Sequence, residues 1–189
     1  MYVWGYYACF QDFTCPWQNF DFMGPDFRLY KKSGVTAVMC QLPWGRLGDF
    51  VDLRCWLLAK LAWNPDQDED ALIRSWIDGT CGKGAPFMRQ YYDLRLAQRA
   101  RTKSVVYGGQ DYLYLPALAL FDQALAATVD EPEAHSRIER LSAGVLALLI
   151  LHYDEKPMEE EARRLKITLP PREELFKRFE VLTKKYNQG

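Results

Sequence analysis

The chain has 189 residues, of which 49% are hydrophobic and 14% aromatic. This composition excludes a disordered polypeptide, and the length allows one large domain or two small ones. Lys and Arg number 24 and Asp and Glu number 25, which gives a formal net charge of -1. A nucleic-acid groove or a surface for anionic membranes normally shows a basic excess, so we expect neither partner. No apolar run approaches the roughly 18 residues that a membrane-spanning helix needs.

The cysteines and histidines show no metal-binding pattern. The cysteines are Cys9, Cys15, Cys40, Cys55 and Cys81. They contain no C-x-x-C pair, and the two histidines lie far from them in the sequence, so we expect no structural zinc and no other cofactor. Five reduced, mostly buried thiols favour a reducing compartment and lean towards the cytoplasm. The first ten residues lack the basic and apolar regions of a signal peptide.

The acidic run DQDED at residues 66–70 resembles the opening of a calcium-binding loop. Such a loop also requires Gly at its sixth position and Glu at its twelfth, where this sequence has Ala71 and Ile77. Acidic residues in a first helical turn are favoured by the helix dipole. We therefore expect a solvated helix start here and no metal.

Two aromatic or apolar segments near the start predict β-strands. Residues 2–10 (YVWGYYACF) and 35–41 (VTAVMCQ) are nearly continuous in apolar character, which is typical of strands buried on both faces of a parallel sheet. Residues 11–26 contain two prolines and a glycine and predict a long, aromatic loop. Residues 27–33 predict a short helix that ends at Gly34.

Residues 48–63 (GDFVDLRCWLLAKLAW) predict the amphipathic helix on which the other elements pack. Asp49 is the expected N-cap, and Pro65 is expected to end the helix because it pushes the preceding residue out of the helical region. Arg54 and Lys60 lie within this helix, and structural salt bridges or snorkelling explain them more simply than substrate binding.

After residue 66 the strand signal nearly disappears. Helices are predicted over residues 68–79, 86–99, 114–128 and 172–185, and from Pro132 onwards, with a charged surface segment at 159–165. The predicted fold is therefore an α/β start followed by a mainly α-helical part, with helix dominating overall. We divide the chain into residues 1–66 and 67–189.

The block GVTAVMCQ and the block from Gly48 to Leu94 carry a family resemblance. Its most specific part runs from Leu53 to Asp66, including Ala-Lys-Leu-Ala-Trp-Asn-Pro-Asp. It resembles the end of the catalytic barrel in the bacterial, glycoside-hydrolase-like proteins classed as domain of unknown function 4838, and a related Leu-Ala-Trp-Asn-Pro ending appears in the α-glucuronidase family. The resemblance reaches to about Tyr153. It implies that residues 2–10 and 35–41 are the last two strands of an eight-stranded β/α barrel, followed by a helical post-catalytic domain.

In such barrels the chemistry lies at the carboxyl ends of the strands and in the loops after them. The resemblance therefore implies substrate contacts from Tyr6, Tyr7, Gln41 and Trp44, because aromatic rings stack on sugar rings and amides pair with hydroxyls. Simple packing is the alternative for the tyrosines. The catalytic acids of related hydrolases come from earlier strands, so we expect no catalytic residue here and no activity from this chain alone.

Two hypotheses for the function follow. The first is a C-terminal fragment of a glycoside-hydrolase-like, carbohydrate-active protein, consisting of a partial barrel and a helical domain. The second is a non-enzymatic helical interaction module whose β-rich start completes the sheet of a partner. The resemblance implies carbohydrate as a partner. Because two parallel strands leave edges bare, the missing part of a barrel or a second copy of the chain is also an expected partner.

Overall fold

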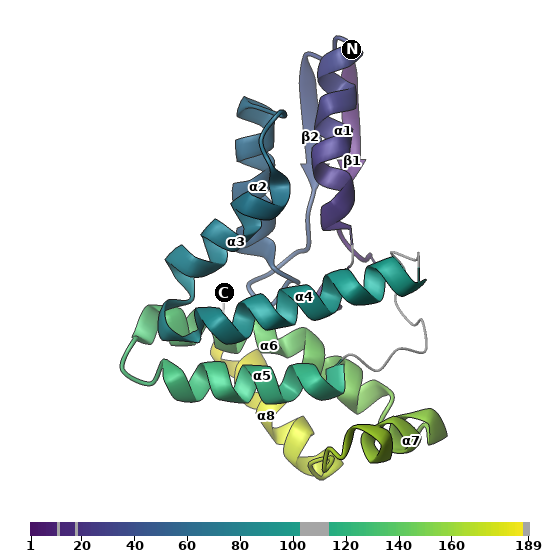
Figure 1. Cartoon of the computed structure of the whole chain (residues 1–189), viewed down its shortest axis with the longest axis vertical. Helices are drawn as coiled ribbons and strands as arrows, with labels where there is room; N and C mark the ends of the chain where they lie inside the picture. Colours follow the sequence, from purple (N-terminus) through teal and green to yellow (C-terminus); the bar gives the residue numbers. More distant parts are fainter. Residues whose placement is uncertain (11, 18, 103–113, 187–189) are drawn as a thin grey trace.

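The computed structural model describes residues 1–189 except 11, 18, 103–113 and 187–189. Two strands and two helices stand on a layer of further helices (Figure 1). The elements in chain order are β1 (Tyr2–Tyr6), α1 (Phe20–Lys32), β2 (Ala37–Gln41), α2 (Val51–Trp63), α3 (Glu69–Thr80), a 3-10 turn (Gly82–Gly84), α4 (Ala85–Thr102), α5 (Tyr114–Ala127), α6 (Pro132–Leu151), α7 (Lys156–Leu165) and α8 (Arg172–Tyr186). The predicted α/β start and the dominance of helix are confirmed.

β1 and β2 form a parallel pair in which Tyr2 faces Ala37 and Tyr6 faces Gln41. The predicted strand at residues 2–10 is four residues too long, and the one at 35–41 begins two residues too early. The prediction that both faces are buried is wrong, because alternate side chains of β1, including Tyr6, are exposed. Helix α1 covers one face, and in the described part of the chain no helix covers the other.

Helix α1 corrects the prediction of a loop over residues 11–26, since it begins at Phe20 and includes Gly24 and Pro25. Pro25 cannot donate a backbone hydrogen bond, yet the helix continues through it. Gly24 is explained by packing, because a Cβ there would lie 2.5 Å from the carboxylate oxygens of Glu69. Arg28 in α1 donates to both oxygens of that carboxylate, at 3.2 Å each, and so ties α1 to α3.

Helix α2 begins one residue later than the predicted N-cap implies. Asp49 is not its N-cap: Phe50 occupies that position with a left-handed φ of 48°, and no side chain caps the helix. The end is as predicted, because Asn64 adopts an extended conformation before Pro65. The buried face consists of Leu53, Arg54, Leu57, Leu58 and Leu61. Ala62, near the end of the helix, is exposed.

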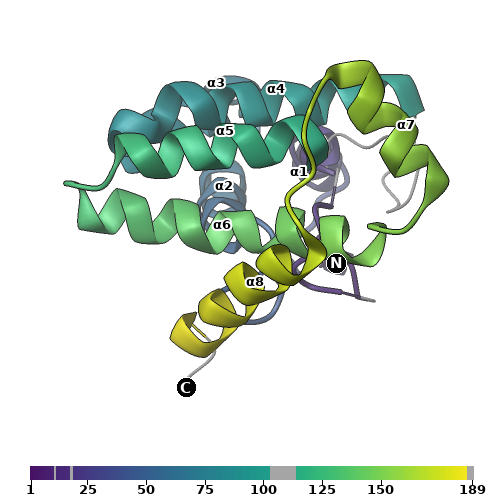
Figure 2. The ribbon, with the colours of Figure 1, turned by 90° about the horizontal axis from the view of Figure 1, so that it is seen from below.

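The helical part follows the predicted segments closely. Helix α3 continues one residue beyond the predicted end at Gly79, and the segment predicted as a charged surface at residues 159–165 belongs to α7. Helices α5 and α6 lie side by side and α8 crosses α6 (Figure 2). Within the described residues, no helix has the length and apolarity needed to cross a membrane.

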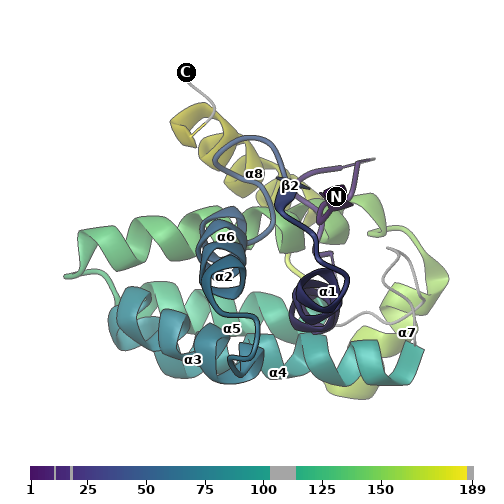
Figure 3. The same cartoon turned by 90° about the horizontal axis from the view of Figure 1, so that it is seen from above.

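The two parts of the chain share one core. From above, α1 and α2 are seen almost end-on over the layer of α3 to α6 (Figure 3). Phe50 stacks on Tyr91 of α4 with ring centroids 6.0 Å apart, and Tyr91 contacts Phe121 of α5 at 4.8 Å. The three aromatic rings therefore continue the core from the loop after β2 into the helical layer.

Candidate functional site

The four residues predicted to contact substrate lie in different environments. Tyr6 ends β1 and is 62% exposed, whereas Trp44, in the loop after β2, is 83% exposed. Gln41 ends β2 opposite Tyr6 and is half-buried. These three side chains are accessible at or near the carboxyl end of the sheet.

Tyr7 is the exception, because its side chain is only 2% exposed. Its hydroxyl donates to Asp26 Oδ2 at 2.9 Å and lies 3.5 Å from the Tyr30 hydroxyl. Burial, the hydrogen bond with Tyr30 and the Asp26 charge raise the pKa of the Tyr7 phenol far above its usual range. Asp26 and Tyr30 belong to α1, so Tyr7 lies on the helix-covered side of the sheet. The burial of Tyr7 and its hydrogen bond to Asp26 agree with a packing role, which was the alternative to substrate contact.

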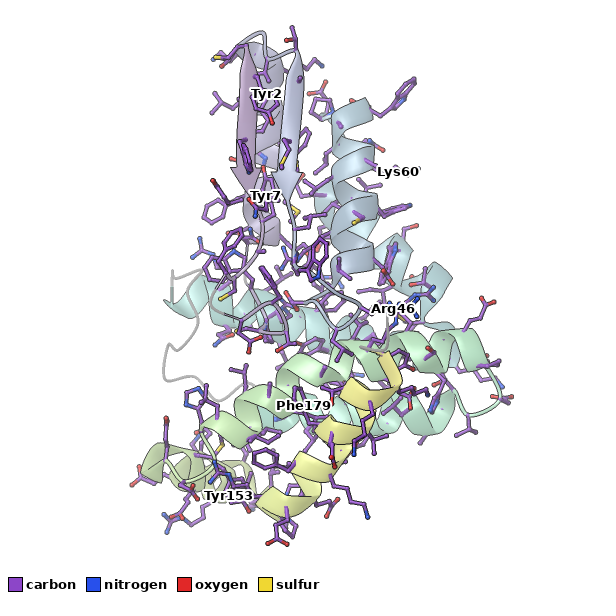
Figure 4. All side chains as sticks on the ribbon, turned by 180° about the vertical axis from the view of Figure 1, so that it is seen from behind. Tyr2, Tyr7, Arg46, Lys60, Tyr153 and Phe179 are labelled. Atoms are coloured by element: carbon purple, nitrogen blue, oxygen red, sulfur yellow. The ribbon has the colours of Figure 1, made fainter. Side chains whose placement is uncertain are left out.

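The exposed face of the sheet carries a continuous series of aromatic rings, Trp4, Tyr6, Phe10 and Phe13, which we call the aromatic row. Consecutive ring centroids are 6.3 Å, 5.4 Å and 5.8 Å apart, the first pair stacked and the others edge to face. This is the face towards the viewer in Figure 4, where the strands lie in front of α1. The row runs from the sheet into the loop after β1.

One polar side chain is held against the row. Gln41 Oε1 accepts a hydrogen bond from Trp4 Nε1 at 3.1 Å, across the two strands. This bond fixes the indole and directs the amide of Gln41 towards the same face. Exposed rings beside an amide can stack on an apolar ligand surface while the amide pairs with a polar group. Because Trp4 and Phe10 are 50% and 48% exposed, both remain accessible to a ligand.

Sequence reasoning missed Phe10 and Phe13 as members of the row. Phe10 was assigned to the first strand, and Phe13 to an irregular loop. The signal that could have found the row is the alternation of Tyr2, Trp4 and Tyr6, which places three aromatic side chains on one face of a strand.

Beneath the loops that follow the two strands lies a buried group of charges, Asp49, Arg54 and Arg95, which we call the arginine cluster. Arg54 Nη2 donates to Asp49 Oδ2 at 2.7 Å, and Arg95 donates to both carboxylate oxygens, at 2.7 and 2.9 Å. Both arginines also donate to the Trp17 carbonyl oxygen. All three charged side chains are buried. The structural role predicted for Arg54 is confirmed, and Arg95 is a partner that the sequence did not reveal.

The cluster contains two cations and one anion, so aromatic faces supply part of the missing negative potential. The Arg54 guanidinium lies 4.3 Å from the Phe20 ring centroid, and that of Arg95 lies 5.0 Å from Phe50. Burial alone would raise the pKa of Asp49, but the charges and hydrogen bonds of Arg95 and Arg54 outweigh it and hold that pKa below its usual value. Asp49 therefore stays ionised inside the protein.

Other candidate chemical groups have structural explanations. Burial and the nearby Asp26 charge raise the pKa of the Cys40 thiol to about 11, so Cys40 is protonated at neutral pH and a poor nucleophile. In the acidic run, Asp68 caps α3 by accepting from the Ala71 backbone N–H at 3.0 Å. Among the described residues, no group of three or more His, Cys, Asp and Glu side chains could hold a metal ion.

Residues 1–93 match a protein-family model described as Domain of unknown function (DUF4838). The match supports assigning this part of the chain to that family. The match spans the sheet, α1, α2, α3 and the first half of α4, and it confirms the family recognised in the sequence. It ends well before Tyr153, the limit of the resemblance. No curated protein and no solved structure shows a significant match. The division of the chain at residue 66 stays a prediction.

Proposed function

We propose that this chain is the C-terminal part of a glycoside-hydrolase-like, carbohydrate-active protein and that the aromatic row contributes to its sugar-binding site. The single observation that carries the proposal is the row itself. Trp4 and Tyr6 lie on an uncovered sheet face and Phe10 follows them in the loop, with Gln41 held beside Trp4 by the 3.1 Å hydrogen bond. Sugar rings have apolar faces that stack on aromatic side chains and hydroxyl groups that pair with amides.

The chemistry of the row supports binding without catalysis. Glycoside hydrolysis ordinarily requires two carboxyl groups on either side of the scissile bond. The row and Gln41 contribute rings, a phenol and an amide, but no carboxyl group. In this proposal the catalytic acids come from other strands of a larger sheet. The open edges of β1 and β2 agree with this, since each strand is paired on one side within the described residues.

The proposal predicts that Trp4→Ala weakens polysaccharide binding about fivefold, because a stacking ring is worth about 1 kcal/mol. Native electrophoresis through gels that contain soluble xylan, mixed-linkage β-glucan or pectin measures this as reduced retardation. Trp63→Ala is the matched control, since Trp63 is 90% exposed at the end of α2 and lies outside the row. Unretarded wild-type protein in all three gels, or equal losses in both variants, would contradict the proposal.

The open edges also support a second candidate function, a non-enzymatic module that completes the sheet of a partner. Exposed strand edges with apolar side chains pair readily with other strands. In the described part of the chain both β1 and β2 have such an edge, and Met39 of β2 is exposed on the same face as Trp4.

This second candidate predicts self-association of the purified chain and its loss in Met39→Lys, because a charge beside the edge opposes strand pairing. Light scattering coupled to size-exclusion chromatography over a range of concentrations measures the mass. Val181→Lys places the same charge on an exposed apolar position of α8 and serves as the control. A wild-type chain that stays monomeric at every concentration argues against sheet completion by a second copy.

A further inference from the structure

Arg95 connects the helical part of the chain to both loops at the carboxyl end of the sheet. It lies in α4, yet its guanidinium donates to the Asp49 carboxylate in the loop after β2. The same guanidinium donates to the Trp17 carbonyl in the loop after β1, at 3.0 Å. Asp49 lies 46 residues before Arg95 in the sequence, and Trp17 lies 78 residues before it. One side chain therefore fixes two loops that approach from different strands.

The aromatic row ends at this connection. The backbone N–H of Asp49 donates to the carbonyl oxygen of Phe13 at 2.8 Å. Phe13 contacts Phe10 at 5.8 Å, and Phe10 contacts Tyr6 at 5.4 Å. The Trp17 N–H also donates to Asp49 Oδ2, at 3.0 Å, so the loop that bears Phe10 and Phe13 is held to Asp49 at two points.

We infer that Arg95 is a positioning residue for the aromatic row: α4 fixes, through Asp49 and the Trp17 carbonyl, where the loop end of the row lies. This inference rests on the proposed function in one respect, that the row binds carbohydrate. Its structural content, the dependence of Phe10 and Phe13 on Arg95, is independent of the ligand.

The geometry requires arginine and not merely a positive charge. Arg95 satisfies both oxygens of Asp49 and a backbone carbonyl with two nitrogens of one planar group. A lysine at this position keeps the charge but offers a single ammonium, which cannot reproduce the planar fork. Arg95→Lys therefore separates the positioning role from the charge.

The test compares Arg95→Lys with Arg74→Lys. Arg74 also joins two carboxylates, Asp70 and Asp93, but at the surface between α3 and α4. In Arg95→Lys we expect at least tenfold faster amide hydrogen exchange at Trp17 and Asp49, together with shifted aromatic NMR signals of Phe10 and Phe13. Polysaccharide affinity should fall at least threefold. Arg74→Lys should change none of these.

Unchanged exchange and unchanged Phe10 and Phe13 signals in Arg95→Lys would overturn the inference. Altered signals with full polysaccharide affinity would instead contradict the proposed function, because the row would then move without affecting binding. If the wild-type protein binds no polysaccharide, the proposed function fails, while the exchange rates and ring signals still decide whether Arg95 positions the row.

Should Arg95→Lys not fold, native-state hydrogen exchange on the wild-type protein decides. We expect the amides of Trp17 and Asp49 to open together with those of α4 around Arg95. If they open at a lower free energy than α4, the loops are independent of the helix and the inference is wrong.

Discussion

Replacing Asp49 with Asn is expected to lower the free energy of unfolding by about 3–5 kcal/mol, because it removes one partner of a buried ion pair and leaves the other uncompensated. In this protein two fully buried arginines would lose their shared anion. Typical domains are stable by about 5–15 kcal/mol, so the change takes a large share of the total. Urea unfolding, followed by circular dichroism, measures the difference between wild type and variant.

Asp93→Asn provides the matched control. It makes the same change in a pair with Arg74 that is partly exposed, where the Asp93 side chain is 54% accessible. Exposed pairs contribute about 0–1 kcal/mol because solvent screens them. Equal effects of the two substitutions would show that the arginine cluster does not depend on the Asp49 charge.

The pH dependence of stability gives an independent measurement of the same carboxylate. The pKa of Asp49 is lowered in the folded protein from its ordinary value of 3.8. A lowered folded-state pKa contributes stability above the ordinary value, and this contribution is lost as the pH falls through the folded value. The stability difference between wild type and Asp49→Asn should therefore be full at neutral pH and shrink in acid below 3.8. A difference that is constant with pH would contradict the lowered pKa.

The sequence predicts the helices well because their determinants are local. Apolar spacing and proline positions place α6 from Pro132, and the spacing of Leu175 and Leu182 places α8. The prediction fails where a distant contact decides. Gly24 and Pro25 suggest a loop when read locally, but the carboxylate of Glu69 packs against Gly24 and Arg28 binds that same carboxylate, which holds α1 in a helix.

Asp49 shows the same limit at the site. An acidic residue just before an amphipathic helix is a normal N-cap, and nothing local distinguishes it from half of a buried ion pair. The deciding partner, Arg95, lies 46 residues further on. The uncovered sheet face could not be predicted either. A nearly continuous aromatic and apolar strand is typical of a sheet covered on both faces, and nothing in its sequence shows that one cover is absent here. Gln41 ends β2 as predicted, and Trp44 follows it in the next loop. The predicted first strand, in contrast, ran four residues beyond Tyr6, where β1 ends.

The contact between the loop after β1 and helix α6 depends on a glycine. A Cβ on Gly144 would lie 2.1 Å from the Thr14 carbonyl oxygen and 3.1 Å from Pro16 Cδ. The closer atom is backbone, so a rotamer change cannot relieve the clash. The loop that carries Phe13 therefore rests directly on the backbone of α6, and a larger residue must push the two apart.

Gly144→Ala is accordingly expected to lower the free energy of unfolding by about 1–3 kcal/mol through overpacking, although alanine favours a helix by about 1 kcal/mol over glycine. Gly79→Ala isolates that helix preference, because Gly79 lies in α3 with no atom within 4 Å of an added Cβ. We expect Gly79→Ala to stabilise the protein by about 0.5–1 kcal/mol. Urea unfolding of the two variants should thus give changes of opposite sign. Stabilisation by Gly144→Ala would mean that the loop after β1 does not rest on the backbone of α6.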